Sequence, residues 1–345
     1  MIECNVLIVG CGLSGASAAY SLTKAGVKDV VVIERMSGDA YSHYHRTCGE
    51  AVSDRMIDAS EIPKDCIVRA VSRIRLICGD TVINVPVKGR IIDRNSLLST
   101  LKGLSDASFV KDSVKSVRKD PRGFVVTCAD GEYLCRYLIG ADGAFSAVRK
   151  ELFDVRPEMC FPIVNNLVSG DSDTEDLIFE VSDKYPGTYR WDFPSKDGLR
   201  SKGYALGNDD IGDYSERGIR FFVSGSSRRV VDGNCCLVGD AGMLANPLCF
   251  GGIGIALLTG KKAAECISRG DLTQYQRWVN KDVIFDHHYM AAHEEFSQWT
   301  GPQIVDAVKP LSKGYSVLRG AYAILRRPRW ANVYMSLWMA FRHGW

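Results

Sequence analysis

The feature that most restricts the fold of this chain is a glycine-rich hexapeptide near its N-terminus, GCGLSG at residues 10–15. An aliphatic run at residues 6–9 precedes it, residues 16–25 favour a helix, and residues 30–33 form a second β-branched run. A strand, a tight turn, a helix and another strand in this order predict one βαβ unit of a parallel sheet. We therefore expect an α/β protein.

The hexapeptide fits GxGxxG, a pattern that holds the pyrophosphate of a dinucleotide. Gly10, Gly12 and Gly15 would allow the tight turn, the approach of phosphate to backbone and the close packing of helix on strand. Ser14 opens the helix, where free N–H groups favour an anion. Glu34 ends the second strand, nineteen residues after Gly15, where an acidic side chain can bind ribose hydroxyls. An ordinary glycine-rich turn is the alternative, but the flanking elements favour a dinucleotide site.

Composition excludes several classes of protein. The chain has 345 residues, 46% of them hydrophobic, with 43 Lys and Arg against 41 Asp and Glu, which suits a folded globular protein and gives no sign of a nucleic-acid partner. Twelve cysteines without a CxxC pair favour reduced thiols over a disulfide scaffold or a zinc site. We expect no signal peptide, because Glu3 and the glycine-rich turn interrupt the N-terminus. We expect no membrane span, because the longest apolar runs, residues 247–258 and 331–341, are too short.

Antiparallel strands interrupt the parallel-sheet segments. Short alternating runs at residues 66–87 and 155–231 indicate them, and a hairpin is expected at residues 124–137, turning at Asp130-Gly131 because Asp-Gly tolerates positive φ. Asp93 is expected to cap a helix at residues 91–104. We divide the chain into a discontinuous dinucleotide-binding domain (1–61, 90–153 and 232–270), an inserted antiparallel-sheet substrate domain (62–89 and 154–231) and a C-terminal helical segment (271–345).

Two later acidic turns indicate which cofactor the chain binds. Residues 138–149, LIGADGAFSAVR, place Asp142 at the end of a strand, and residues 237–242, LVGDAG, do the same for Asp240. With GxGxxG these are the three fingerprints, in order, of the FAD-dependent family typified by para-hydroxybenzoate hydroxylase, which the chain resembles. The alternative is three unrelated turns. The resemblance implies a Rossmann-like FAD-binding domain with an inserted antiparallel sheet, FAD as cofactor, and Asp142 among the residues that bind it.

The same resemblance implies roles for further residues. Asp240 would bind the ribityl chain, and the helix that opens at Gly252 and Ile253 would point its positive end at the pyrimidine edge of the flavin, favouring the reduced anion. Arg94 falls where the family keeps an arginine beside the cofactor, although a surface helix position is the alternative. Val114 falls where a backbone group meets the adenine side.

Two segments are similar to the archaeal geranylgeranyl reductases. RTCGEA at residues 46–51 matches an Arg-x-Cys-Gly-Glu type stretch beside the flavin, YRWDFP at residues 189–194 matches a YxWxFP motif of the lipid pocket, and residues 246–253 match a loop after the Gly-Asp motif. The resemblance places these residues beside the flavin: Arg46, Cys48, Gly49 and Ala51. It places these in the substrate pocket: Tyr189, Trp191 and Phe193.

This resemblance implies an enzyme that saturates isolated double bonds of geranylgeranyl chains in ether lipids, with hydride from flavin N5 to one carbon and a proton to the other. Such a bond is a poor hydride acceptor, so the site should be dry and apolar. Tyr189, Trp191 and Phe193 alternate along a strand and share one face; a packed core cluster is the alternative. Cys48 is the candidate proton donor, because a thiol donates without a buried charge; a small apolar filler is the alternative.

Departures from the family keep other readings open. About forty residues separate Pro194 from Gly239, an interval that holds cap helices in the family, and Phe250 stands where glycine is usual, so the length of the bound chain and the number of bonds reduced stay open. An FAD-dependent monooxygenase or halogenase is one alternative, since YRWDFP is also similar to the halogenase WxWxIP signature. A flavoprotein that binds polyprenyl lipid without turnover is another. The external electron donor could be NAD(P)H, a deazaflavin or ferredoxin.

The C-terminal segment differs from the rest in charge. Residues 307–345 carry seven Lys and Arg and no Asp or Glu, whereas residues 1–306 carry 36 basic and 41 acidic side chains. Basic residues interleaved with aromatic ones suit an anionic membrane surface. A basic face packed on the chain itself and an acidic protein partner are the alternatives. We expect a cytoplasmic protein in peripheral contact with a membrane. The aromatic residues are Tyr315, Tyr322, Trp330, Tyr334, Trp338, Phe341 and Trp345.

Overall fold

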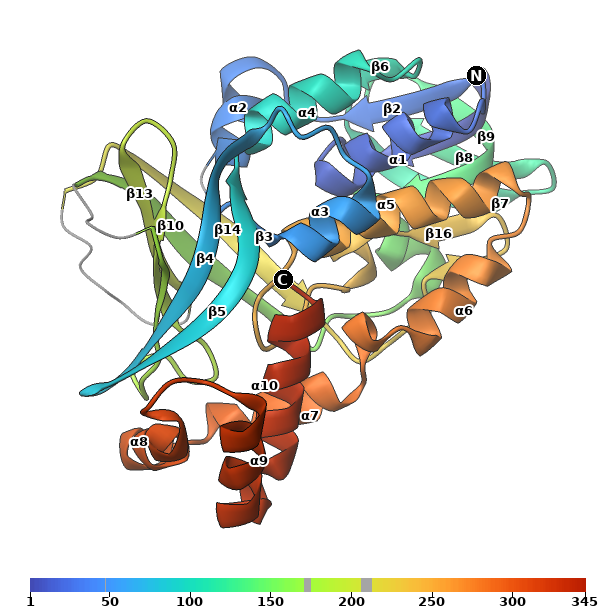
Figure 1. Ribbon diagram of the computed structural model, residues 1–345. Coiled ribbons are helices and arrows are strands. Elements are labelled where there is room, and N and C mark those ends of the chain that lie inside the picture. The colour runs from blue at the N-terminus through green and yellow to red at the C-terminus, as the bar shows by residue number, and fades with distance from the viewer. Residues whose placement is uncertain (47, 171–174, 206–212) are drawn as a thin grey trace.

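The computed structural model describes residues 1–46, 48–170, 175–205 and 213–345. Its described strands form two eight-stranded sheets, the first on the side of the N-terminus and the second on the other side of the molecule (Figure 1). A group of helices from the end of the chain lies below both. The expected class is confirmed: an α/β protein with a Rossmann-like domain, a second and largely antiparallel sheet, and C-terminal helices.

The first sheet has a parallel centre. Strand β1 (Ile2–Val9) pairs in parallel with β2 (Val30–Glu34) on one side and β9 (Glu132–Gly140) on the other. Helix α1 (Leu13–Lys24) joins β1 to β2 as the βαβ unit requires. Aliphatic side chains are buried along these strands because helices or other layers cover both faces. The outer strands are β6 (Ser108–Lys111), β7 (Val114–Asp120), β8 (Gly123–Cys128), β15 (Val231–Asp232) and β16 (Cys235–Leu237).

The hairpin between β8 and β9 forms where it was expected, but for a different reason. Neither Asp130 nor Gly131 has a positive φ. Instead the buried Asp112 carboxylate accepts hydrogen bonds from the backbone N–H groups of Ala129 (3.0 Å) and Asp130 (3.3 Å). A side chain from the preceding loop therefore holds this turn, which the Asp-Gly pair alone could not reveal.

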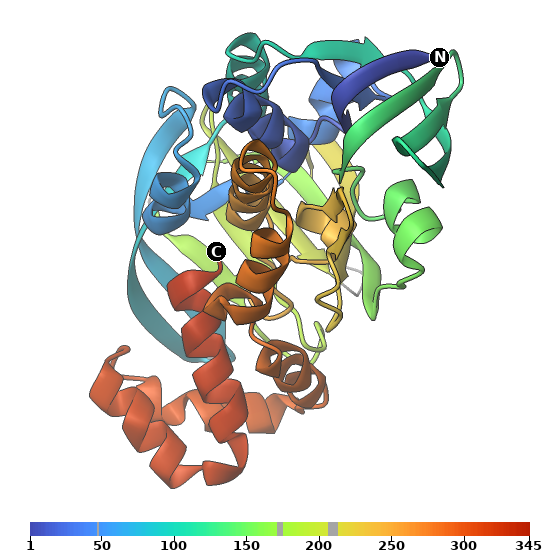
Figure 2. The same cartoon turned by 90° about the vertical axis from the view of Figure 1, so that its right-hand side faces the viewer.

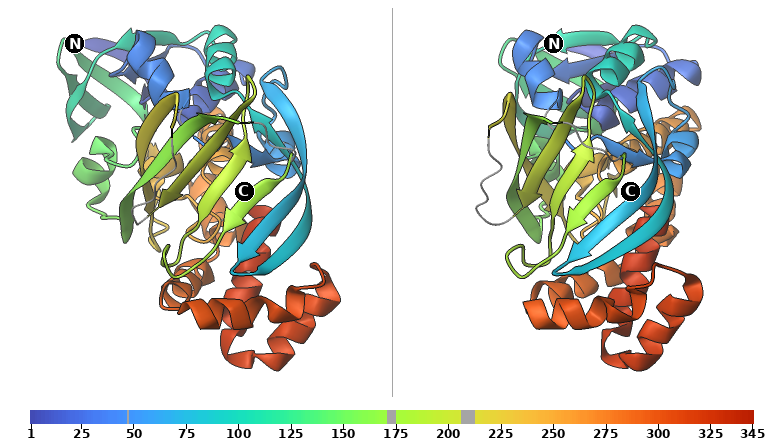
Figure 3. Two further views of the ribbon diagram at one scale, coloured as in Figure 1. Left: turned by 90° about the vertical axis from the view of Figure 1, so that its left-hand side faces the viewer. Right: turned by 60° about the vertical axis from the view of Figure 1, so that its left-hand side comes forward.

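The second sheet is antiparallel except where β11 runs parallel to β4, and Figure 3 shows it from the side opposite the first sheet. Strand β3 belongs to this sheet through its pairing with β5, although the predicted domain boundaries assign its residues to the cofactor domain. The strands, in spatial order, are β14 (Glu216–Ser224), β10 (Met159–Ser169), β13 (Leu199–Ala205), β12 (Arg190–Pro194), β11 (Leu177–Glu180), β4 (Ile67–Cys78), β5 (Thr81–Ile92) and β3 (Ala51–Ser53).

The helices of the cofactor domain pack against the first sheet. Helix α5 (Ile253–Ser268) lies closely on α1, where Ser17 donates a hydrogen bond to the Leu257 carbonyl (2.7 Å). Asp93 caps α4 (Arg94–Gly103) by accepting from the N–H groups of Asn95 and Ser96, as expected. The remaining elements are α2 (Gly38–Arg46), α3 (Asp54–Ser60), η1 (Arg149–Phe153), η2 (Gly239–Gly242), α6 (Thr273–Lys281) and η3 (Val283–Phe285).

The C-terminal helices form a separate group at the end of the molecule away from the N-terminus (Figure 2). They are α7 (His288–Ser297), α8 (Gly301–Val308), η4 (Lys309–Leu311), α9 (Val317–Arg326), η5 (Pro328–Trp330) and α10 (Ala331–His343). Among the described residues, no helix combines the length and the apolar composition needed to cross a bilayer.

The seven C-terminal aromatic residues differ in their exposure. Trp330 and Trp345 are buried, and Tyr334 and Phe341 pack against the same apolar cluster as the second sheet. Only Tyr322 and Trp338 among the seven are exposed large apolar side chains. The aromatic content of this segment therefore serves the core as well as the surface, because its helices must cover one end of the second sheet.

Candidate functional site

A cavity of about 760 Å³ lies between the two sheets and is lined by residues from both. One part is bordered by the glycine-rich turn, the end of β2 and the two acidic turns. The other part is bordered by aromatic side chains of the second sheet and of α10. We refer to these as the polar half and the aromatic half of the cavity. Nearly all of the predicted site residues line one half or the other.

The glycine-rich turn forms the floor of the polar half. Gly10 has φ +94°, and a Cβ there would lie 2.4 Å from the Ala141 carbonyl oxygen. A Cβ on Gly15 would lie 2.0 Å from the Gly10 carbonyl oxygen, so this residue closes the turn against the helix. A Cβ on Gly12 would meet nothing closer than His45 Cε1 at 3.7 Å, because it points into open space. Each glycine therefore serves a different steric need.

Glu34 stands at the expected place beside this turn. Its carboxylate accepts hydrogen bonds from the backbone N–H groups of Cys11 (2.8 Å) and Met36 (2.9 Å). The side chain borders the cavity while these two bonds fix its orientation. Val114, the first residue of β7, lines the same end of the cavity.

The two acidic turns differ in what their carboxylates do. Asp142 accepts hydrogen bonds from the Ser146 hydroxyl (2.5 Å) and the Ala147 N–H (2.7 Å), so it caps the following turn. The buried Arg149 donates to the Ala241 carbonyl (2.9 Å) and ties the two turns together. Within the part of the chain that the structure describes, the Asp240 carboxylate accepts no hydrogen bond, and burial raises its pKa to about 6. Its oxygens are left available to a ligand.

The N-terminus of α5 meets the polar half beside Asp240. Gly252 is the N-cap, and a Cβ there would lie 4.0 Å from Asp240 Oδ1. Gly252 and Ile253 both line the cavity. The first N–H groups of a helix lack partners within the helix and carry its positive dipole end. This part of the wall therefore favours an electron-rich group.

His45 and Arg94 add two donors that the sequence did not single out as a pair. His45 is 3% exposed, its Nδ1 lies 3.3 Å from Arg94 Nη2, and its Nε2 has no hydrogen-bond partner among the described residues. A guanidinium can only donate, so Nδ1 accepts and the proton sits on Nε2. Burial and the nearby Arg94 lower the pKa of His45 to about 2, which keeps the ring neutral. A buried N–H without an acceptor lies beside Gly12.

Glu50 is a second buried group that sequence reasoning missed. It is 3% exposed with φ +55°, and its carboxylate accepts from the Arg94 backbone N–H (3.0 Å). Burial raises the pKa of this carboxyl to about 7. Glu50 belongs to the RTCGEA segment, and its side chain lies between the polar half of the cavity and the start of α4.

The RTCGEA segment is divided by the structure. Cys48, Gly49 and Ala51 line the cavity, and Thr47 lies outside the described residues. Arg46 is not part of the cavity wall; its Nε pairs with Glu216 Oε1 of β14 at 3.1 Å. That Arg46 binds the cofactor therefore stays a prediction, and the structure shows its guanidinium held by a carboxylate of the second sheet.

Tyr189, Trp191 and Phe193 all line the aromatic half, as their alternation suggests. Phe179 of β11 joins them, with ring centroids 4.6 Å from Tyr189 and 5.0 Å from Phe193. The Tyr189 hydroxyl donates to the Cys249 carbonyl at 2.7 Å. The three side chains are thus both a cavity wall and part of an aromatic cluster.

A buried polar network fixes this wall to the Cys48 segment. Trp191 Nε1 donates to Asn165 Oδ1 (3.0 Å), and the Ser201 hydroxyl lies 2.6 Å from the same oxygen and 3.1 Å from the Cys48 carbonyl oxygen. A Cβ on Gly49 would lie 3.0 Å from the Phe193 ring. The two motifs that resemble the geranylgeranyl reductases are therefore in direct contact.

The last helix and the residue pair after it contribute side chains that the sequence analysis placed at a membrane surface. Phe341 and Trp345 line the aromatic half. The Trp345 carbonyl accepts from the Ser53 hydroxyl at 2.5 Å, and a Cβ on Gly89 would lie 2.4 Å from the indole. No local pattern could place the end of the chain here, because the contact spans almost the whole sequence.

Phe250, where the resemblance expects glycine, has φ +50°. Bulky residues rarely adopt this conformation, which costs on the order of 1 kcal/mol. Its ring lies 4.6 Å from Phe222 and 5.4 Å from Tyr189, and it borders the cavity. The backbone here keeps a shape suited to glycine while the side chain occupies space in the aromatic half.

Comparison with known proteins agrees with this geometry. A family model described as an FAD binding domain matches residues 3–58. Digeranylgeranylglycerophospholipid reductase 2 of Methanopyrus kandleri is 24% identical, over 94% of this chain and 97% of that protein. The digeranylgeranylglycerophospholipid reductase of Sulfolobus acidocaldarius is 24% identical, over 84% of this chain and 75% of that protein.

Solved structures show the same fold. A geranylgeranyl bacteriochlorophyll reductase-like protein of Thermoplasma acidophilum superposes with a TM-score of 0.79 at 19% identity, covering 98% of this chain and 100% of that one. A probable FAD-dependent monooxygenase of Pseudomonas aeruginosa, pqsL, superposes with a TM-score of 0.68 at 17% identity, covering 88% and 99%. These likenesses establish the architecture.

The chain binds FAD. Together with its fold and relatives, this makes it an FAD-dependent oxidoreductase. The residues present fit the cofactor: Gly12 leaves room for a phosphate, and the Nε2 of His45 and the Nε of Arg94 are buried donors without an acceptor in the described part of the chain. The free carboxylate of Asp240 suits the hydroxyls of the ribityl chain, and the start of α5 suits the flavin edge.

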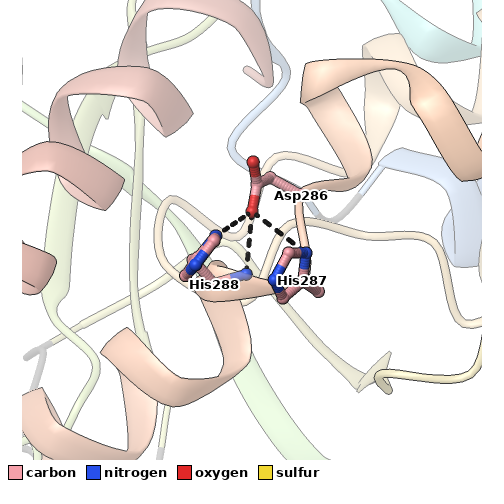
Figure 4. Close-up of side chains that lie close together, drawn as sticks. All are labelled: Asp286, His287 and His288. Carbon is pink, nitrogen blue, oxygen red and sulfur yellow. Dashed lines mark hydrogen bonds and ion pairs between the residues drawn. The ribbon is translucent and has the colours of Figure 1, made fainter.

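One group of potential metal ligands lies outside the cavity. Ligand atoms of Asp286, His287 and His288 lie within 4.8 Å of one another at the start of α7 (Figure 4). One carboxylate oxygen of Asp286 already meets the backbone N–H of His288 at 2.8 Å and its Nδ1 at 2.7 Å. The arrangement is that of an Asx turn opening a helix.

Proposed function

We propose that this chain is an FAD-dependent reductase that saturates C=C bonds of geranylgeranyl chains in prenyl lipids. The observation that carries the proposal is the continuity of the cavity. Its polar half fits FAD, and at the flavin end it opens directly into a half lined by Phe179, Tyr189, Phe193 and Phe341. Aromatic walls suit an unsaturated hydrocarbon chain and exclude water. Relatives named digeranylgeranylglycerophospholipid reductase support the substrate class.

When bound, reduced FAD would supply the hydride for one alkene carbon, and this chain's own residues would orient the substrate and supply the proton. Tyr189 and Phe193, which line the aromatic half, would position the double bond. The Tyr189 hydroxyl is already bonded to Cys249 and presents mainly its ring. The N-terminus of α5 favours negative charge on the reduced cofactor.

Cys48 is proposed as the proton donor. It lines the cavity beside Gly49, which itself contacts the aromatic wall, and so stands where the two halves meet. The Glu50 carboxyl, two residues on, has a pKa raised to about 7 by burial and is a source from which a thiol could be reprotonated. Replacing Cys48 by Ala should slow product formation while leaving bound FAD unchanged.

A monooxygenase is the second candidate, because the fold also matches pqsL. The two functions differ in their use of oxygen. Under argon, a prenyl lipid should reoxidise the reduced flavin of this chain. The flavin absorbance measures this reoxidation. A flavin that is reoxidised only by oxygen would favour the monooxygenase or halogenase. If the protein binds the lipid but its reduced flavin is never reoxidised under argon, the result would favour a non-catalytic lipid-binding flavoprotein.

The external partners are also part of the proposal. The electron donor is NAD(P)H, a deazaflavin or ferredoxin, and trial reduction with each would identify it. We propose further that the lipid substrate stays in a membrane and that the chain is cytoplasmic and meets it there. The acidic body and basic end of the sequence support contact through residues 307–345.

A further inference from the structure

Helix α9 carries large apolar side chains that face solvent. Leu318 is 83% exposed, Leu325 79% and Val317 66%. Tyr322 is 52% exposed, and at i, i+4 and i+7 the residues 318, 322 and 325 share one helix face. We call this set, Val317, Leu318, Tyr322 and Leu325, the α9 face.

Folded chains rarely leave several neighbouring side chains of this size in water. The opposite side of α9 is used normally, since Ala323 is fully buried. A second exposed apolar group in the described chain, Phe145, Ile219 and Phe221, lines the cavity. Others, such as Ile2 on β1 and Leu104 after α4, lie on separate elements. The α9 face does not line the cavity, so its exposure needs a separate explanation.

The charge around the α9 face identifies the kind of partner. Residues 307–345 carry seven Lys and Arg and no acidic side chain. Arg326 lies over the Tyr322 ring at 5.9 Å, and Arg342 lies over Trp338 at 5.2 Å, so cations and aromatic rings border the apolar residues. An apolar stripe flanked by cations fits the interface of an anionic bilayer. A soluble acidic partner would match the cations but leave the leucines without a purpose.

The same group of C-terminal helices reaches the aromatic half of the cavity. Helix α10 has 13 residues, so it spans about 20 Å. It begins beside α9, packs along it and carries Phe341 to the wall of the aromatic half. A bilayer held at the α9 face would thus lie within about the length of one helix from the aromatic half of the cavity.

We propose that the α9 face docks the protein on the surface of an anionic phospholipid bilayer, with Leu318 and Leu325 inserted among the acyl chains. This rests on the proposed function, because a membrane lipid is the substrate. The helix has 10 residues and lies in the interface without crossing it.

The test is sedimentation of the FAD-loaded protein with phosphatidylglycerol vesicles and with phosphatidylcholine vesicles. The protein should bind the first at least tenfold more strongly, and Leu318→Gln/Leu325→Gln should remove most of that binding. Leu104→Gln, an exposed leucine of the cofactor domain, is the matched control and should bind normally. Arg326→Gln/Arg329→Gln should weaken binding at low salt and differ little from the parent protein at high salt.

Two results would overturn the proposal. One is unchanged vesicle binding by the double leucine variant. The other is a dimer in light scattering that this variant dissociates while vesicle binding persists, which would make the α9 face an interface between two copies.

A second assay separates docking from catalysis. With a short prenyl substrate dispersed in detergent, the double leucine variant should reduce at the parent rate, and it should be slow only on vesicle-held lipid. If both proteins bind vesicles in the expected way and neither reduces either substrate, the proposed function fails and the docking surface stands.

Discussion

The two halves of the cavity are built in different ways. The polar half is made from short contiguous motifs, and its shape depends on backbone positions such as Gly10, Gly12 and Gly15. The aromatic half is made from side chains of β11, β12 and α10, which come together only in the folded protein. A cofactor site of this kind can therefore be predicted from local sequence motifs, whereas a substrate pocket depends on packing between distant segments.

The largest expected effect separates folding from cofactor binding in the polar half. Gly15→Ala would place a methyl group 2.0 Å from the Gly10 carbonyl oxygen, so it should lower the free energy of unfolding by about 3 kcal/mol or more and abolish FAD retention. Gly12→Ala has room for the methyl group and should unfold normally, yet bind FAD about 100-fold more weakly. Thermal unfolding and FAD titration measure the two quantities.

Equal destabilisation by these two substitutions would break the distinction. It would mean that Gly12, like Gly15, serves the packing of the turn and does not mark the path of a phosphate.

The next prediction concerns Glu50, which follows Cys48 by two residues. This segment lies where the two halves of the cavity meet. Its folded pKa, about 7, is raised above the ordinary 4.5 by burial, so the charged form is the unfavourable one in the folded state. The contribution of the Glu50 carboxyl to the free energy of unfolding is therefore fully present below about pH 4.5 and is lost as the pH rises through 7. Glu50→Gln should match the parent protein at low pH and exceed it by up to about 3 kcal/mol above pH 7.

Denaturant unfolding at several pH values, with and without FAD, measures this difference. Glu294→Gln, at an exposed position on α7, is the control and should give no such pH dependence. A constant offset between Glu50→Gln and the parent protein at every pH would show that the Glu50 carboxyl does not titrate in this range.

A third prediction probes the aromatic half without touching the polar half. Phe193→Ala removes a ring that contacts Phe179 and the Gly49 backbone. It should lower the rate of lipid reduction by about 30-fold, or about 2 kcal/mol, through loss of substrate positioning. The FAD content and flavin spectrum should stay those of the parent protein. Loss of FAD in this variant would show that the two halves are not independent.

The smallest effect belongs to His45. Its Nε2–H is a buried donor, and a phosphate oxygen would satisfy it. His45→Ala should weaken FAD binding by about tenfold, near 1.4 kcal/mol, while His45→Gln, which can still donate, should recover part of it. Titration of the FAD-free protein with FAD measures both. Tighter binding by the alanine variant would show that His45 obstructs the site.

The fold and the polar half could be predicted because their signals are local. A turn at Gly10 needs positive φ, and Asp240 follows a buried strand, so sequence order alone places them at one edge of the first sheet. Arg46 shows the limit of this reasoning. It belongs to the correct segment, but an ion pair with Glu216, 170 positions along the chain, turns it away from the cavity.

The residues that were missed share a physical reason. His45 acquires its role from the neighbouring Arg94, and Glu50 from its burial and the Arg94 N–H, neither of which has a sequence signature. Phe341 and Trp345 were read as surface aromatics because basic residues surround them. Only the packing of α10 against the second sheet shows that they line the aromatic half.

We propose above all that the polar half and the aromatic half of the cavity act together on a prenyl lipid. The most direct test is mass spectrometry of digeranylgeranylglyceryl phospholipid after anaerobic incubation with the chemically reduced, FAD-loaded protein. We predict that the lipid gains the mass of two hydrogen atoms for each bond reduced, and that Phe193→Ala gives much less of this product. Unchanged lipid in the presence of intact, reduced FAD would contradict it.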